Sequence, residues 1–248
     1  MALVPLSAIV WYDLRHHPGT PVWRVRWQLD PAALATLLRL GVPAMLQMAF
    51  EVGVFALASS MAASQTPTAI AAHQVSLELA GLAYMVPLGI ASAAAVRVGH
   101  AVGRRDGPGA EHAGWAAILM GMTAMATTAL LFVLLPRLLI GVFSRDPEVI
   151  RTGTSLLAIG AVFAVFDGVQ VITTGALRGL GETRRPMLWN LVGHWGIGLR
   201  IGWTLAFAAG WGVLGIWIGL STGLIVVAIA LTRAWARTAR EWRLHCGV

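Results

Sequence analysis

The chain has no lysine, a single cysteine and few charged residues of either sign. Its 18 basic residues are all arginine, its acidic residues number 11, and charged residues make up 12% of its 248 positions. The single Cys246 excludes an intramolecular disulfide and a cysteine metal cluster. With 57% hydrophobic residues and a mean hydropathy of +0.73, the chain is too apolar for an ordinary soluble domain. These absences favour an integral membrane protein.

Motifs of catalysis are absent as well. The sequence has no HExxH, no GxSxG and no glycine loop followed by lysine, and its seven histidines are too scattered to form a metal site. The arginines fall in clumps between apolar runs, which indicates membrane topology rather than a nucleic-acid-binding face. We therefore expect no enzyme, no metal cofactor and no nucleic-acid partner.

Six apolar runs are long enough to cross a bilayer, whose hydrocarbon core needs about 20 apolar residues per helix. The runs lie near residues 41–63, 69–96, 113–135, 149–177, 187–209 and 212–231. Asp146, Pro147 and Glu148 are typical of a helix start and open the fourth run. The sequence predicts an all-α integral membrane protein with six transmembrane helices.

The arginines predict the orientation of these helices. Fourteen of the 18 lie before the first run, in the links after the second and fourth runs, or in the tail. Since arginine accumulates on the cytoplasmic side, both termini should be cytoplasmic, in a multi-pass protein of the plasma membrane. Residues 1–30 should hold the end of a preceding helix, or an interfacial anchor, plus a cytoplasmic linker. Residues 31–237 should form the six-helix lobe and 238–248 a cytoplasmic tail.

Three carboxylates stand inside the apolar runs, where a charge costs about 2.5 to 3.5 kcal/mol on insertion scales and usually has a function. At a rise of about 1.5 Å per residue, Glu51 and Asp167 lie at matched depths, about 16 to 18 Å from the cytoplasmic face. Two such carboxylates can share a proton or hold a cation. Glu78 lies near the outer surface by the same count, where we expect a solvated interfacial acid.

Arg200 lies near the bilayer centre by this depth count, in the fifth run. An arginine at that depth needs an acid or a water-filled cavity. We expect it to pair with Asp167 or Glu51, which would hold that acid in its charged form and oppose a proton cycle. A position in a wet cavity, or a side chain that snorkels, is the alternative.

Seven short motifs follow one another along the chain. In order, they are Gly41-Val42-Pro43 before Glu51 and Phe55, Ala71-Ala72-His73-Gln74, Met85-Val86-Pro87-Leu88-Gly89, Val96-Arg97-Val98-Gly99, Phe166-Asp167-Gly168-Val169-Gln170, Gly175-Ala176-Leu177-Arg178-Gly179-Leu180-Gly181 and Gly215-Ile216-Trp217-Ile218-Gly219-Leu220. Each motif is weak alone. The ordered set, which covers Asp30 to Arg237, resembles the multidrug and toxic compound extrusion (MATE) family of transporters, in its NorM-like branch.

The resemblance implies twelve helices in two six-helix lobes, of which this chain looks like the second, C-terminal lobe. It also implies that Glu51 and Asp167 bind the coupling Na⁺ or H⁺ transiently, with no other cofactor. The implied function is cation-coupled antiport that exports lipophilic or cationic drugs and toxic compounds. Candidate supporting residues are Gln47, Glu78, Gln170 and Arg200.

Three positions depart from the family pattern. Glu78 stands where relatives often have an amide, Arg200 where they usually have proline, and His194 where they often have tyrosine. The first two add charge to the lobe, which leaves the choice between Na⁺ and H⁺ open.

A lone lobe lacks the partner wall of a central cavity, so the expected partners include a second copy or a separate N-terminal lobe, besides the bilayer and small cationic substrates. Two other functions remain as alternatives. One is an inactive fragment or accessory membrane subunit. The other is a lipid-linked sugar flippase of the same superfamily, for which a basic central cavity is expected.

Overall fold

The computed structural model describes residues 30–246 of the chain. The chain divides into two units, Met1–Leu38 and Arg39–Val248, and the packing described below lies within the second. The expected end of a preceding helix falls in residues 1–29, outside the described residues. All regular structure between residues 30 and 246 is helical, which confirms the predicted fold class.

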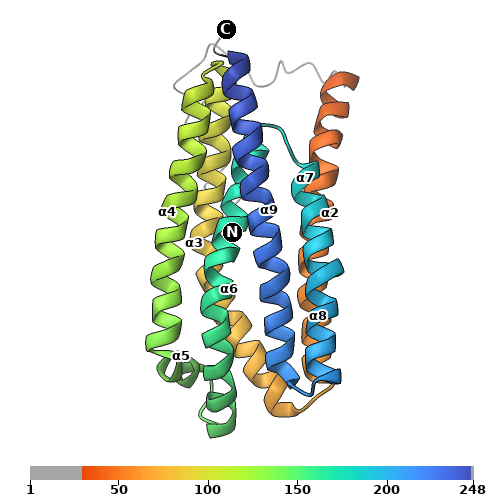
Figure 1. Ribbon diagram of the computed structural model, residues 1–248, viewed down its shortest axis with the longest axis vertical. Helices are drawn as coiled ribbons and strands as arrows, with labels where there is room; N and C mark the ends of the chain where they lie inside the picture. Colours follow the sequence, from red (N-terminus) through yellow and green to blue (C-terminus); the bar gives the residue numbers. More distant parts are fainter. Residues whose placement is uncertain (1–29, 247–248) are drawn as a thin grey trace, which may run out of the picture. The chain divides into compact units, whose positions relative to one another are not determined.

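The six predicted apolar runs correspond to five long helices and one interrupted helix (Figure 1). The long helices are α2 (Pro31–Ala63), α3 (Pro67–Gly103), α4 (Gly107–Leu134), α6 (Pro147–Gly179) and α9 (Gly212–Cys246), each long and apolar enough to cross a membrane. The fifth run forms α7 (Arg184–Asn190), η2 (Leu191–Gly198), α8 (Leu199–Trp203) and η3 (Thr204–Ala208) in direct succession. The chain is thus a multi-pass helical membrane protein.

The starts of the long helices follow local sequence signals. Thr66, Asp106 and Asp146 each accept a hydrogen bond from a backbone N–H in the first turn of the helix that follows. Proline occupies one of the first two positions of each of these helices, where its missing N–H has no intrahelical partner to lose. The predicted start at Asp146 and Pro147 is confirmed, with the Asp146 carboxylate 2.8 Å from the backbone nitrogen of Glu148.

Several helices extend beyond their apolar runs, α2 by ten residues at its start, and one short helix was not predicted. α3 continues to Gly103 and α9 to Cys246, so the segment expected as a tail is helical up to that residue. The last turns of α9 bury Trp235 but expose Arg237 and Arg240, a pattern that hydropathy alone does not detect. The short helix α5 (Pro136–Phe143) connects α4 to α6.

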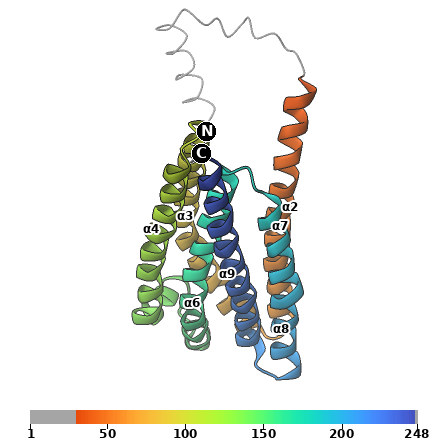
Figure 2. The ribbon, with the colours of Figure 1, turned by 45° about the horizontal axis from the view of Figure 1, so that its top comes forward.

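α6 lies at the centre of the second unit. It packs against α3, α4, α5 and α9, and Figures 1 and 2 both show it between α4 and α9. Its most apolar window is 67% buried, against 17% for α2. Small residues allow the close approach: a Cβ added to Gly175 would lie 2.9 Å from the backbone carbonyl carbon of Ala91 in α3. α6 is therefore the helix that carries Asp167 into the interior.

The interrupted helix follows the backbone of α9. A Cβ added to Gly193 would lie 2.9 Å from the carbonyl oxygen of Gly223, and one added to Gly198 would lie 3.1 Å from that of Gly219. η2 and η3 are π-helices, whose hydrogen bonds join residues five apart. This spacing keeps Gly193 and Gly198 on the face that contacts α9, while Trp195 of η2 contacts α2.

Candidate functional site

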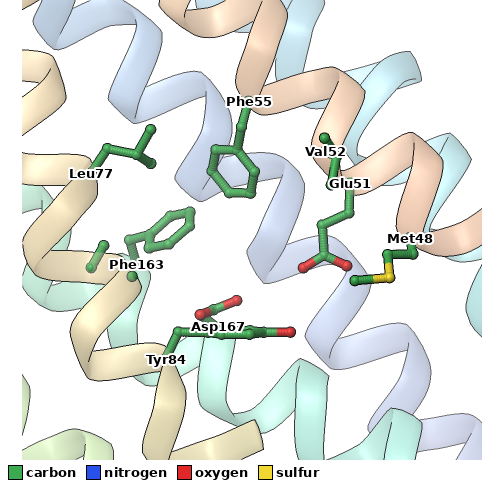
Figure 3. Close-up of a pocket in the computed structure, with 10 residues that line it drawn as sticks. Met48, Glu51, Val52, Phe55, Leu77, Tyr84, Phe163 and Asp167 are labelled. Atoms are coloured by element: carbon green, nitrogen blue, oxygen red, sulfur yellow. The ribbon is translucent and has the colours of Figure 1, made fainter. Parts of the chain in front are cut away.

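A pocket of about 360 Å³ opens between α2, α3 and α6, and Figure 3 shows its lining. Cavities of this size commonly hold small organic ligands. The lining is apolar and aromatic apart from two carboxyl groups and one phenol. It comprises Met48, Glu51, Val52, Phe55, Leu77, Ala80, Gly81, Tyr84, Phe163 and Asp167.

The two carboxylates enter this pocket from different helices (Figure 3). Glu51 of α2 is half-buried, Asp167 of α6 is 7% exposed, and both carboxyl groups line the same pocket. The structure therefore brings together the two acids that the depth count placed at one level. Two negative charges in a poorly solvated pocket repel each other, so a bound proton or cation stabilises the pair. Their role in ion binding stays a prediction.

Asn190 adds a neutral group beside the acids. It ends α7, is 0% exposed, and lies within reach of the Glu51 carboxylate. Within residues 30–246, however, neither end of its amide makes a hydrogen bond of good geometry. Buried amides nearly always have partners. Asn190 can donate to Glu51 after a small movement, or offer its oxygen to an ion or water.

α6 carries more unpaired polar groups beyond Asp167. Gln170, Thr173 and Thr174 are at most 6% exposed, and each has side-chain atoms that lack a hydrogen-bond partner in the described part of the chain. Gln170 and Thr174 lie three and seven residues after Asp167, on the same helix face. Unpaired polar groups in an apolar interior cost free energy, so this face of α6 suits bound water or an ion.

The other expected supporting residues lie in different surroundings. Gln47 is 7% exposed, one helical turn before Glu51 on α2. Glu78 is exposed on α3 and accepts a long hydrogen bond from Gln74 at 3.5 Å, so it does not line the pocket. The solvation of Glu78 stays a prediction.

The expected pairing of Arg200 with Asp167 or Glu51 is wrong. Arg200 is exposed on α8, and within residues 30–246 it makes no ion pair. The helix face explains the difference. Gly198 and Gly202 face α9, and Arg200, two residues from each, points to the opposite side of the helix.

Sequence reasoning missed Tyr84 and Asn190 as members of the site. Tyr84 is one of two tyrosines in the chain, and Figure 3 places its hydroxyl beside the acids. Asn190 is an amide inside an apolar run, which is a signal of function in a membrane segment. Among residues 30–246, no three His, Cys, Asp or Glu side chains come together as a metal-binding group.

Comparisons with known proteins agree with the geometry. Residues 43–204 match the MatE family model. A probable multidrug resistance protein NorM of Brucella suis biovar 1 (strain 1330) is 43% identical over 228 residues, which are 90% of this chain and 48% of the relative. A probable NorM of Rhodopseudomonas palustris is 39% identical over 97% of this chain and 52% of its own length. A crystal structure of MATE in the bent conformation superposes with a TM-score of 0.86 at 19% identity, over 98% of this chain and 54% of that one.

Two carboxylates directed into an apolar pocket of a multi-pass helical protein are a feature typical of membrane transport proteins. The family model and the relatives define the protein further: the chain belongs to the MATE family. It spans about half the length of the curated relatives it matches.

Proposed function

We propose that the chain is one lobe of a cation-coupled antiporter that exports lipophilic cations. The observation that supports this most strongly is the pairing of Glu51 and Asp167 in a pocket whose other walls are apolar and aromatic. The carboxylates attract positive charge, and the apolar and aromatic walls suit the body of an organic cation. One pocket can then bind either the coupling ion or the cationic substrate.

Exchange of ion for substrate follows if the two compete for this one pocket. A proton or Na⁺ at the acid pair removes the negative charge that holds an organic cation, so ion entry favours substrate release. Asn190 and the unpaired groups of α6 can supply neutral oxygen atoms or hydrogen bonds to the ion and its water. The acid pair is therefore the proposed ion site, with either H⁺ or Na⁺ as the coupling ion.

The pocket does not favour the flippase alternative. A lipid-linked sugar carries phosphate, which requires basic side chains. The lining has two acids and no arginine, and Arg200 is exposed on α8 outside it.

Transport can be measured in vesicles that contain only this chain and are loaded with ethidium. We expect efflux under an inward proton or sodium gradient and no efflux from matched vesicles with Asp167→Asn. Efflux that is equal in the two preparations would contradict the proposed ion site. Absence of efflux from both would favour the accessory-subunit alternative.

Assembly is a separate part of the proposal. A second six-helix lobe, either another copy or a separate chain, would supply the facing wall of the central cavity. We expect the active chain to form a parallel dimer in nanodiscs, by mass measurement. Transport by a preparation shown to be monomeric would contradict the dimer.

We further propose that the protein lies in the plasma membrane with both termini in the cytoplasm, because fourteen arginines lie on that side of the sequence-derived topology. Cys246 is the only cysteine and therefore a native reporter. A membrane-impermeant maleimide should label it only after intact cells are opened. Ready labelling of Cys246 in intact cells would contradict the proposed orientation.

A further inference from the structure

A buried histidine joins three helices beside the pocket. His73, in the second turn of α3, is 0% exposed. Its Nδ1 accepts a hydrogen bond from Nε1 of Trp217 in α9 at 3.1 Å, and its Nε2 lies 3.0 Å from Oγ of Ser59 in α2. The imidazole therefore ties α2 and α9 to α3 at one point.

These contacts determine the tautomer of the His73 imidazole. An indole Nε1 can only donate, so His73 Nδ1 must carry the lone pair and Nε2 the hydrogen, which it donates to Ser59. A proton added at Nδ1 would break the hydrogen bond from Trp217. In this arrangement His73 holds its neighbours in place and does not carry protons.

Aromatic packing connects His73 to the pocket. The ring centroid of Trp217 lies 6.0 Å from that of His73 and 5.9 Å from that of Phe163. Phe163 in turn lies 6.1 Å from Phe55. All three pairs meet edge to face, a geometry that aromatic quadrupoles favour. The orientation of each ring therefore depends on the next.

The last two rings of this series are part of the site. Phe55 and Phe163 line the pocket, and each lies four residues, one helical turn, from one of the acids. Ser59 lies one further turn along the same face of α2 as Phe55 and Glu51. Two series of contacts thus connect His73 to the pocket wall, one through the aromatic rings and one along α2.

We propose that His73 is a positioning residue for the substrate, an inference that rests on the proposed function. The hydrogen bond from Trp217 to its Nδ1 sets the orientation of the Phe163 and Phe55 rings. The orientation of these rings in turn determines how well an aromatic cation binds beside the two acids. An aromatic cation would contact both the rings and the carboxylates. A small tetraalkylammonium ion would depend on the carboxylates alone.

The test uses the full chain in nanodiscs, with two cations as probes. His73→Asn keeps an acceptor near the Nδ1 position, whereas His73→Leu removes it at similar volume. Trp217→Phe removes the donor and serves as the second variant if His73→Leu does not fold. Trp203→Phe is the matched control, because Trp203 is 58% exposed and pairs with Phe207 instead.

Two measurements are made on each variant. The first is the affinity for tetraphenylphosphonium and for tetramethylammonium, and the second is the ¹⁹F NMR signal of 4-fluorophenylalanine at Phe55 and Phe163. We expect His73→Leu to weaken tetraphenylphosphonium binding roughly threefold to tenfold, as expected from the loss of one hydrogen bond and one aromatic orientation. Tetramethylammonium binding should not change, and both ¹⁹F signals should shift. His73→Asn and Trp203→Phe should resemble the wild type.

Three results would overturn the inference. They are an equal loss of tetraphenylphosphonium binding in His73→Asn and His73→Leu, unchanged ¹⁹F signals in His73→Leu, and an equal weakening of both cations. A wild-type protein that binds neither cation would contradict the proposed function instead. The ¹⁹F comparison of His73→Leu with His73→Asn would then decide by itself whether His73 positions the rings.

Discussion

α2 and α6 have the same length, 33 residues, and each carries one acid of the pocket, yet they are held in different ways. α6 is surrounded by α3, α4, α5 and α9, and its most apolar window is 67% buried. α2 has a window that is 17% buried and exposes large side chains such as Met45, Met48 and Val52. The comparison indicates that Asp167 lies on a closely packed helix, whereas Glu51 lies on a helix with few neighbours among the described residues.

The attachments of α2 near the acid are few and specific. Trp195 of η2 donates its indole N–H to the carbonyl oxygen of Phe50 at 3.0 Å and packs against Gly53. Ser59 bonds to His73, and Asn190 lies within reach of Glu51. Movement of α2 would therefore carry Glu51 toward or away from a stationary Asp167. We expect ion binding to stabilise the arrangement in which the two acids are close.

The largest effect should come from removing either charge. Glu51→Gln and Asp167→Asn keep the shape of the side chain but cannot titrate or hold a cation by charge. We expect each to reduce gradient-driven efflux to the level of empty vesicles while the protein still inserts and folds. Glu78→Gln is the matched control, since Glu78 is exposed and outside the pocket. Loss of transport in the Glu78 variant alone would show that Glu51 and Asp167 are not the ion site.

Stability should respond unequally to the same substitution in the two helices. A Cβ at Gly175 of α6 would meet the backbone of Ala91, which cannot yield without separating the helices, so Gly175→Ala should cost about 1 to 3 kcal/mol. Gly41 of α2 has open space around it, so Gly41→Ala should be neutral or slightly stabilising. The thermal unfolding midpoint of each variant in detergent tests this. Equal losses would mean that α2 is packed as firmly as α6.

A smaller effect should follow from loosening α2. Trp195→Phe keeps most of the ring but removes the donor to Phe50, a loss of about 0.6 kcal/mol for an average hydrogen bond between membrane helices. We expect faster amide hydrogen exchange along α2 and no change along α6, measured by mass spectrometry. Trp203→Phe, at an exposed tryptophan, is the control. Faster exchange in both helices would show that they move together.

The smallest effect is expected at Arg200. Because its side chain is exposed and pairs with neither acid, Arg200→Leu should leave the pH dependence of efflux unchanged within about twofold, as for surface substitutions in general. Arg200→Lys, which keeps the charge, should behave the same. If the pH profile shifts in the Leu variant but not in the Lys variant, the result would indicate that Arg200 pairs with one of the acids in another conformation.

The sequence predicted more of the helices than of their contacts. Apolar runs located the crossings, and the depth count placed Glu51 and Asp167 at one level, because rise per residue is constant in a helix. The direction of a side chain around the helix axis is a different quantity. It depends on neighbours, as Arg200 shows: the contacts of Gly198 and Gly202 with α9 decide where it points.

The interrupted helix could not be predicted either. Hydropathy does not distinguish an α-helix from a π-helix, so the turns of η2 that orient Gly193 and Gly198 have no signal in composition. The same holds for Tyr84 and Asn190, whose place beside the acids depends on how three helices pack. The extension of α9 to Cys246 was missed because its exposed arginines end the apolar run without ending the helix.

The central claim is that Glu51 and Asp167 form one site for which the coupling ion and the organic cation compete. The most direct measurement is the affinity for tetraphenylphosphonium in nanodiscs over a range of pH and Na⁺ concentration. We predict that either protons or Na⁺ weaken binding to the wild type, and that this competition disappears in both Glu51→Gln and Asp167→Asn. Competition that persists in the double variant would contradict the account.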